Sequence, residues 1–261
     1  MDPDLTLRYA DHDDALVDVH LPPARTAAHA TAGAGAGDTV PVVLLLHGGF
    51  WRVAYDRTHT RPMARAFADA GAVVLTPEYR RVGGVGRLAG GWPHTFDDVD
   101  AAYAAVPHLL AEAGVRSTSL TVAGHSAGGH LALWLANQAG AERPVIDRVV
   151  GLAPVGDLRA AYDAGLGDGA VQALLGGRPE DHPERYAAAD PALRMDDRPA
   201  SAVVVVHGED DDIVPLANSE SLAARHPWVE LVRVPGAHFG VITPDSAAWP
   251  RVVAAVLGSS S

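Results

Sequence analysis

The stretch Gly124-His125-Ser126-Ala127-Gly128 joins an apolar, β-forming run at 119–123 to a helix-forming run at 127–139. A serine raised on a tight strand-to-helix turn needs small residues two positions before and after it, because larger side chains would collide with the neighbouring elements. The two outer glycines meet this need. Ser126 would then point its hydroxyl above a sheet, and the N–H of Ala127, at the helix N-terminus, would face a developing oxyanion. We therefore expect a serine nucleophile at 126.

Continuous apolar segments alternate with helical ones on both sides of this turn. We expect strands at 5–9, 15–20, 42–47, 73–77, 119–123, 145–153, 202–207 and 230–234, and helices at 61–70, 95–113, 127–139, 216–225 and 246–257. Thr95 is placed to cap its helix, and Pro107 should kink or split that helix. The alternation predicts an α/β fold, with a mostly parallel sheet of about eight strands and helices on both faces.

The chain length and two irregular segments predict the domain organisation. The 261 residues fit a single domain, 1–261. Residues 22–39 are rich in Pro, Ala and Gly, which favours a flexible surface loop. Residues 155–200 interrupt the alternation with polar, helix-prone sequence. A cap-like helical insertion there would lie over the carboxyl ends of the strands, where open α/β sheets bind ligands.

Composition excludes several kinds of chemistry and several partners. The net charge of −12 disfavours nucleic acid and anionic membrane surfaces as partners. All 20 basic residues are arginine and there is no cysteine, which excludes lysine Schiff bases, disulfides and thiolate nucleophiles. The first residues carry no apolar targeting core and the apolar runs are too short to span a bilayer, so we expect a cytoplasmic protein. The oligomeric state stays open, with a homodimer among the possibilities.

The stretch His47-Gly48-Gly49-Phe50-Trp51 follows the apolar strand expected at 42–47. Two glycines after a strand permit a turn that aims successive N–H groups into a site, so Gly49 and Phe50 are candidates to complete an oxyanion hole with the N–H at 127. His47 fits a structural brace for this loop better than a catalytic role. Trp51 fits a core position and a pocket wall equally well.

An acidic loop and a histidine follow two later strands. The loop 207–215 reads HGEDDDIVP and follows the strand at 202–207, and His238 follows the strand at 230–234. An acid placed there can orient a histidine and stabilise its charged form, with Asp210, Asp211 and Asp212 all available. The order of serine, then acid, then histidine along the chain is that of the α/β-hydrolase triad.

These four motifs together resemble the α/β-hydrolases over nearly the whole chain. The stretch 47–51 resembles the HGGxW motif of kynurenine formamidases (arylformamidases) and related bacterial esterases, and it departs from the HGGG motif of the hormone-sensitive-lipase group. The acid loop of these families reads GxxDxxVP, which selects Asp211 from the three carboxylates. The resemblance implies Ser126 as nucleophile, His238 as base and no cofactor.

Other readings of the sequence are weaker. No HExxH motif occurs, His125 and His130 are five residues apart, and the acidic loop lacks the DxDxDG spacing of calcium loops, so we expect no metal. The glycines at 83, 84 and 86 lack the rest of a dinucleotide fingerprint.

The motifs define the reaction better than the substrate. We expect hydrolysis of a small ester or amide with an aromatic or apolar group, first an N-formylkynurenine type of substrate, alternatively a short-chain carboxylic ester. A small serine peptidase and a non-catalytic receptor rank lower. Residues that could bind the substrate are Trp51, Leu158, Tyr162 and Phe239.

Overall fold

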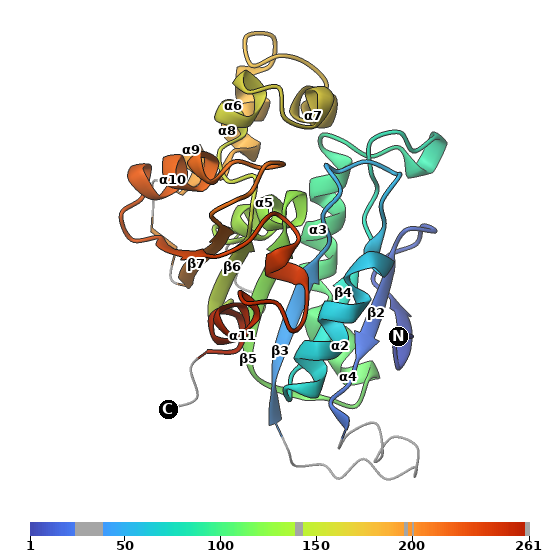
Figure 1. The fold of residues 1–261 in the computed structure, drawn as a ribbon. Helices are drawn as coiled ribbons and strands as arrows, with labels where there is room; N and C mark the ends of the chain where they lie inside the picture. The colour runs from blue at the N-terminus through green and yellow to red at the C-terminus, as the bar shows by residue number, and fades with distance from the viewer. Residues whose placement is uncertain (24–38, 139–142, 196–197, 200, 259–261) are drawn as a thin grey trace.

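The described part of the chain forms one eight-stranded sheet (Figure 1). The computed structural model describes residues 1–23, 39–138, 143–195, 198–199 and 201–258. The strand order is β1-β2-β4-β3-β5-β6-β7-β8; β1 and β2 run antiparallel to their neighbours, and the other pairs are parallel. The predicted mostly parallel sheet is therefore confirmed. The strands are β1 (Leu5–Arg8), β2 (Leu16–His20), β3 (Thr39–Leu46), β4 (Val73–Pro77), β5 (Arg116–His125), β6 (Arg148–Leu152), β7 (Ala202–Gly208) and β8 (Glu230–Val234).

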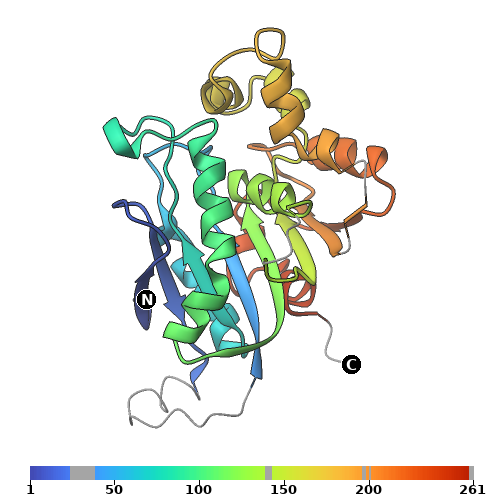
Figure 2. The same cartoon turned by 180° about the vertical axis from the view of Figure 1, so that it is seen from behind.

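Helices cover both faces of the sheet, as two views from opposite sides show (Figures 1 and 2). Two helices, α2 (Arg61–Asp69) and α11 (Trp249–Leu257), pack on one face. The other face is covered by α3 (His94–Ala104), α4 (Val106–Glu112), α5 (Ala127–Leu135) and α10 (Leu216–Arg225). The central strands are thus buried on both sides, which explains their continuous apolar sequences.

The predicted split at Pro107 is confirmed. Residues 95–113 form two helices, and Pro107 lies in the first turn of the second, where its missing N–H is tolerated. The prediction that Thr95 caps the first helix was wrong, because α3 begins at His94. The hydroxyl of Thr95 instead donates to the carbonyl of Arg80 at 2.6 Å and accepts from the N–H of Gly91 at 2.9 Å.

The segment expected as an insertion forms four helices: α6 (Leu158–Asp163), α7 (Leu166–Leu175), α8 (Pro183–Ala189) and α9 (Pro191–Arg194). Helices α6, α7 and α8 lie beyond the carboxyl ends of the strands (Figure 1). Three hydrogen bonds tie α7 to the main body: the N–H of Trp92 donates to the carbonyl of Leu174 at 2.7 Å, and Arg52 donates to the carbonyls of Gly167 at 2.5 Å and Asp168 at 3.0 Å.

Three short 3-10 helices complete the described elements: η1 (Arg57–Thr60), η2 (Gly86–Leu88) and η3 (Gly240–Ile242). Most of the predicted loop 22–39 lies outside the described residues. Among the described residues, no helix is long and apolar enough to cross a membrane.

Candidate active site

Ser126 lies on the tight turn between β5 and α5. Its backbone is strained, with φ 55° and ψ −118°, and its N–H donates to the carbonyl of Leu152 at 2.9 Å. A Cβ at Gly124 would come within 2.1 Å of the carbonyl oxygen of Gly128, and a Cβ at Gly128 within 2.2 Å of that of Leu46. The two glycines of the motif are therefore required by backbone crowding on both sides of the serine.

Asp211 and His238 come together from the loops after β7 and β8. The Nδ1 of His238 donates to the Oδ2 of Asp211 at 2.7 Å. The other carboxylate oxygen accepts from the N–H groups of Ile213 at 3.0 Å and Val214 at 2.9 Å. Burial alone would raise the pKa of Asp211, but hydrogen bonds from two histidines and from the backbone hold it well below the ordinary value. The carboxylate is thus kept ionised beside the imidazole.

The histidine of this pair lies next to the serine turn. The ring centroids of His238 and His125, the residue before the serine, are 4.5 Å apart, and the Nε2 of His125 lies 3.1 Å from the carbonyl oxygen of His238. Burial, followed by the charge of His238, lowers the pKa of His125 to about 3, so this ring is neutral at physiological pH. By contrast, Asp210 and Asp212 are exposed to solvent.

The loop after β3 presents three consecutive residues with positive φ: 108° at Gly49, 49° at Phe50 and 56° at Trp51. A Cβ at Gly48 would lie 3.2 Å from the Cβ of Ser126, so the loop packs directly against the serine. In the described part of the chain, the N–H groups of residues 49, 50 and 127 have no acceptor. Unpaired N–H groups beside a serine are what an oxyanion hole needs.

Trp51 anchors this strained loop in the core. Its side chain has 0% exposure, and its ring meets that of His130 edge-on at 5.1 Å between centroids. Its carbonyl accepts from the N–H of Val82 at 2.8 Å, and the N–H of Val53 donates to the carbonyl of Val82 at 3.0 Å. The ring of Phe50 lies against Gly167 of the insertion. Such contacts offset backbone strain of about 1–3 kcal/mol per residue.

A buried contact between a histidine and a glutamate braces the start of the same loop. The Nε2 of His47 lies 2.7 Å from the Oε1 of Glu78, and the ring of Tyr79 stacks on the imidazole at 4.2 Å. Burial would raise the pKa of Glu78, but the charge and hydrogen bond of His47, with Arg81, lower it below its ordinary value. Glu78 is a site residue that the sequence motifs do not predict. The one signal for it in the sequence is the position of an acid directly after the apolar strand β4.

The predicted substrate-binding residues lie in different environments. Phe239 is 56% exposed and meets the ring of His238 edge-on at 5.3 Å. Tyr162 is half-buried on α6 and packs near Tyr186 at 6.2 Å between ring centroids. Leu158, like the tryptophan at 51, is 0% exposed and belongs to the core, so neither offers surface to a substrate in this conformation.

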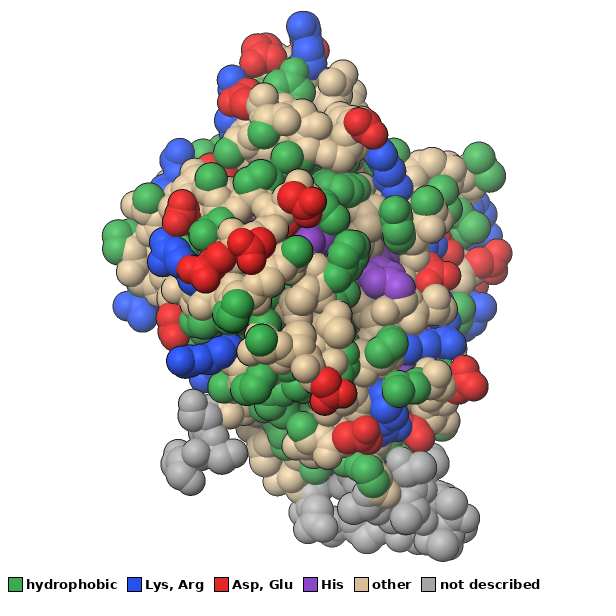
Figure 3. All heavy atoms as spheres, in the orientation of Figure 1, with side chains coloured by type: hydrophobic (Ala, Val, Ile, Leu, Met, Phe, Trp, Pro, Cys, Tyr) green, Lys and Arg blue, Asp and Glu red, His purple; other side chains and the backbone are tan. Residues whose placement is uncertain are grey.

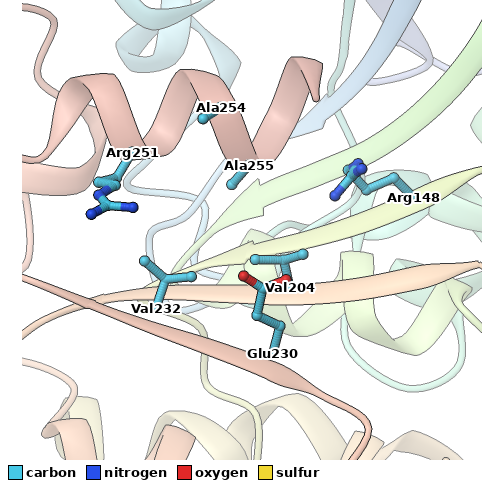
Figure 4. A pocket seen from close by; sticks show the side chains of 7 residues that line it. All are labelled: Arg148, Val204, Glu230, Val232, Arg251, Ala254 and Ala255. Atoms are coloured by element: carbon cyan, nitrogen blue, oxygen red, sulfur yellow. The ribbon is translucent and has the colours of Figure 1, made fainter. Parts of the chain in front are cut away.

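The molecular surface shows where a ligand could approach. Histidine side chains reach the surface among hydrophobic ones on the face below the insertion (Figure 3). A separate hollow of about 300 Å³ lies between α11 and strands β6 to β8, rimmed by Arg148, Glu230 and Arg251 (Figure 4). The residues of this hollow include none of the triad candidates. Across the described ranges, no group of three or more His, Asp or Glu side chains is arranged to hold a metal ion.

Comparisons with known proteins agree with this geometry. Residues 32–225 match the model of the BD-FAE family. Carboxylesterase NlhH of Mycobacterium tuberculosis is 38% identical over 105 residues, covering 39% of this chain and 30% of that protein. Esterase LipQ of the same species is 25% identical over 218 residues, covering 77% and 50%. The chain thus spans half or less of the length of these relatives.

The fold has close structural counterparts. A crystal structure of esterase B from Lactobacillus rhamnosis, inhibited with a tributyrin phosphonate, superposes with a TM-score of 0.75 at 19% identity, covering 98% of this chain and 84% of that one. The sheet order and its two helical layers are those of the α/β-hydrolase fold. Since the family match covers most of the chain, the protein belongs to the BD-FAE family of α/β-hydrolases.

Proposed function

We propose that the protein is a serine carboxylesterase, with Ser126 as nucleophile, His238 as base and Asp211 as the acid that orients the base. The observation that carries this proposal is the 2.7 Å hydrogen bond between Asp211 and His238, beside a serine held at φ 55°. The esterase names of the two curated relatives support the same reaction class.

The mechanism follows from the placement of these groups. The Nε2 of His238 takes the hydroxyl proton of Ser126 as the oxygen attacks the ester carbonyl. The N–H groups of Gly49, Phe50 and Ala127 stabilise the oxyanion, and one such donor typically contributes about 2.7–4 kcal/mol. The imidazolium then returns its proton to the departing alcohol, and water attacks the acyl-enzyme through the same steps. The mechanism needs no metal or cofactor.

The proposed substrates are small esters with an apolar or aromatic group. Phe239 is exposed beside the base, so its ring can stack on such a group. Tyr162 stays a candidate for binding the substrate. A cytoplasmic location and a homodimer remain predictions.

A formamidase is the second candidate. It rests on the HGGFW stretch at 47–51, and a formyl group needs almost no acyl pocket. The relatives described above are named as esterases, which places the short-chain ester first. Comparing kcat/KM for p-nitrophenyl acetate, p-nitrophenyl butyrate and N-formylkynurenine separates the two: a formamide rate at background would exclude the second candidate.

Active-site labelling tests the shared mechanism. We expect a fluorophosphonate probe to label the wild-type protein and to leave Ser126→Ala unlabelled. Ser126→Ala and His238→Ala should each lower kcat by several orders of magnitude, because triad residues act as a unit. If the wild-type protein failed to react and hydrolysed none of the esters, a non-catalytic receptor would be the better description.

A further inference from the structure

His207 lies at the carboxyl end of β7 and is 0% exposed, yet the mechanism above gives it no role. Its Nε2 lies 3.2 Å from the Oδ2 of Asp211 and 2.9 Å from the carbonyl oxygen of Val214. Its Nδ1 lies 2.7 Å from the hydroxyl of Ser219 on α10, which is also fully buried. The imidazole therefore connects α10 to the acid of the triad.

The partners of the ring define which nitrogen carries hydrogen. A carbonyl and a carboxylate are both acceptors, so the Nε2 of His207 must be a donor. In the neutral ring the Nδ1 is then an acceptor, and the hydroxyl of Ser219 donates to it. The two acceptors at Nε2 thus fix the tautomer of His207, and the hydroxyl of Ser219 supplies the donor that this tautomer needs at Nδ1.

We propose that His207 is a positioning residue for the proposed esterase: with Ser219 behind it, it holds the Oδ2 of Asp211 toward the Nδ1 of His238. This inference rests on the proposed function. The Oδ2 is the oxygen shared by the two histidines, whereas the Oδ1 is held by the backbone N–H groups after it. Without the His207 donor, only the backbone N–H groups on Oδ1 and the base itself would orient the carboxylate.

The titratable side chains around this carboxylate are few. His207 approaches from β7, His238 from the loop after β8, and His125 packs against His238. The low pKa of His125, about 3, keeps its ring neutral at physiological pH. A change in the pH profile on substitution of His207 therefore reports on the pair formed by Asp211 and His238.

A matched pair of amide substitutions tests the role. The amide nitrogen of His207→Gln can reach the position of Nε2 and keep the donor, while the shorter His207→Asn places its amide near Nδ1 and loses it. With p-nitrophenyl acetate, we expect His207→Asn to lower kcat by about tenfold to a hundredfold with little change in KM. The acid limb of kcat/KM should move to lower pH, because a carboxylate that is no longer held toward the base stabilises the protonated base less. His207→Gln should stay within about threefold of wild type.

Two outcomes would overturn this inference. Equal losses in His207→Asn and His207→Gln, or losses in thermal stability alone with an unchanged pH midpoint, would leave His207 a core residue without a positioning role. Ser219→Ala, which removes only the hydroxyl, offers a milder variant if His207→Asn fails to fold, and it should shift the same pH limb. Turnover by the wild-type protein but not by Ser126→Ala tests the proposed esterase function separately. A failure of that function can therefore be told apart from a failure of the role proposed for His207.

Discussion

Among the three adjacent aspartates of the acidic loop, only Asp211 hydrogen-bonds the base. It is 8% exposed and hydrogen-bonded to His238, whereas Asp210 and Asp212 face solvent. We expect Asp211→Asn to lower kcat by about ten-thousandfold, because the amide would select the wrong imidazole tautomer. The measurement is kcat on p-nitrophenyl acetate at constant pH.

The flanking acids supply matched controls for that prediction. Asp210→Asn and Asp212→Asn each remove one charge from the same loop without touching the base. Both should retain activity within about twofold, since exposed charges at this distance are screened. Losses of similar size in all three variants would mean that Asp211 is not the orienting acid.

The candidate site residues that the sequence predicts are those with local motifs. Ser126 and His238 each follow a strand and lie in a short pattern with steric or chemical meaning, and the family resemblance selects Asp211. Glu78 and His207 carry no such pattern. Their roles depend on partners contributed by other strands and helices, and a sequence pattern does not give those contacts.

At the scale of elements, the loop after β3 depends on backbone shape more than on side-chain chemistry. Gly49 has φ 108°, and a Cβ there would lie 2.4 Å from the Cβ of Tyr55. Gly49→Ala should therefore displace the loop and lower kcat by about a hundredfold or more, since a misplaced oxyanion donor costs 10²–10³ in rate. The readout is kcat together with the melting temperature.

A second glycine separates backbone strain from steric displacement. Gly71 has a similar φ of 103°, but a Cβ there would meet nothing within 4 Å. Gly71→Ala should thus destabilise the protein by about 1 kcal/mol through strain while leaving kcat unchanged. If Gly49→Ala behaved like Gly71→Ala, the loop would not contribute an oxyanion donor at this position.

Elements were predictable where burial on both faces imposes continuous apolar sequence. The strand β4, buried along its whole length, begins and ends where the apolar run predicts, at Val73–Pro77. Thr95 and Trp51 show where local reasoning is insufficient. A threonine at a helix start satisfies either the helix or a neighbouring loop, and a tryptophan after two glycines fits either core or pocket. Tertiary packing decides between these alternatives.

Across the whole molecule, the buried histidines make stability depend on pH, and the net charge of −12 does not reveal this effect. Burial lowers the pKa of His125 to about 3 and of His130 to about 4, and it also lowers those of His20 and His59. These rings stay neutral in the folded state at pH values where the unfolded chain protonates them. One group opposes them: burial raises the pKa of Asp190 to about 6, so the folded state takes up a proton there first.

Because the unfolded chain binds more protons than the folded one, the protein should lose stability in mild acid. Between pH 6 and 4.5 the histidines at 125 and 130 are protonated in the unfolded chain but stay neutral in the folded one. Asp190 is protonated first in the folded state, which compensates for one of these two protons. The free energy of unfolding, measured by urea denaturation, should fall by about 1.4 kcal/mol or more per pH unit. His130→Gln keeps a donor for the carbonyl of Ala189 and removes one titrating ring, so its slope should be shallower by about one proton. A flat profile in the wild type, or an unchanged slope in His130→Gln, would show that these buried rings do not control stability in acid.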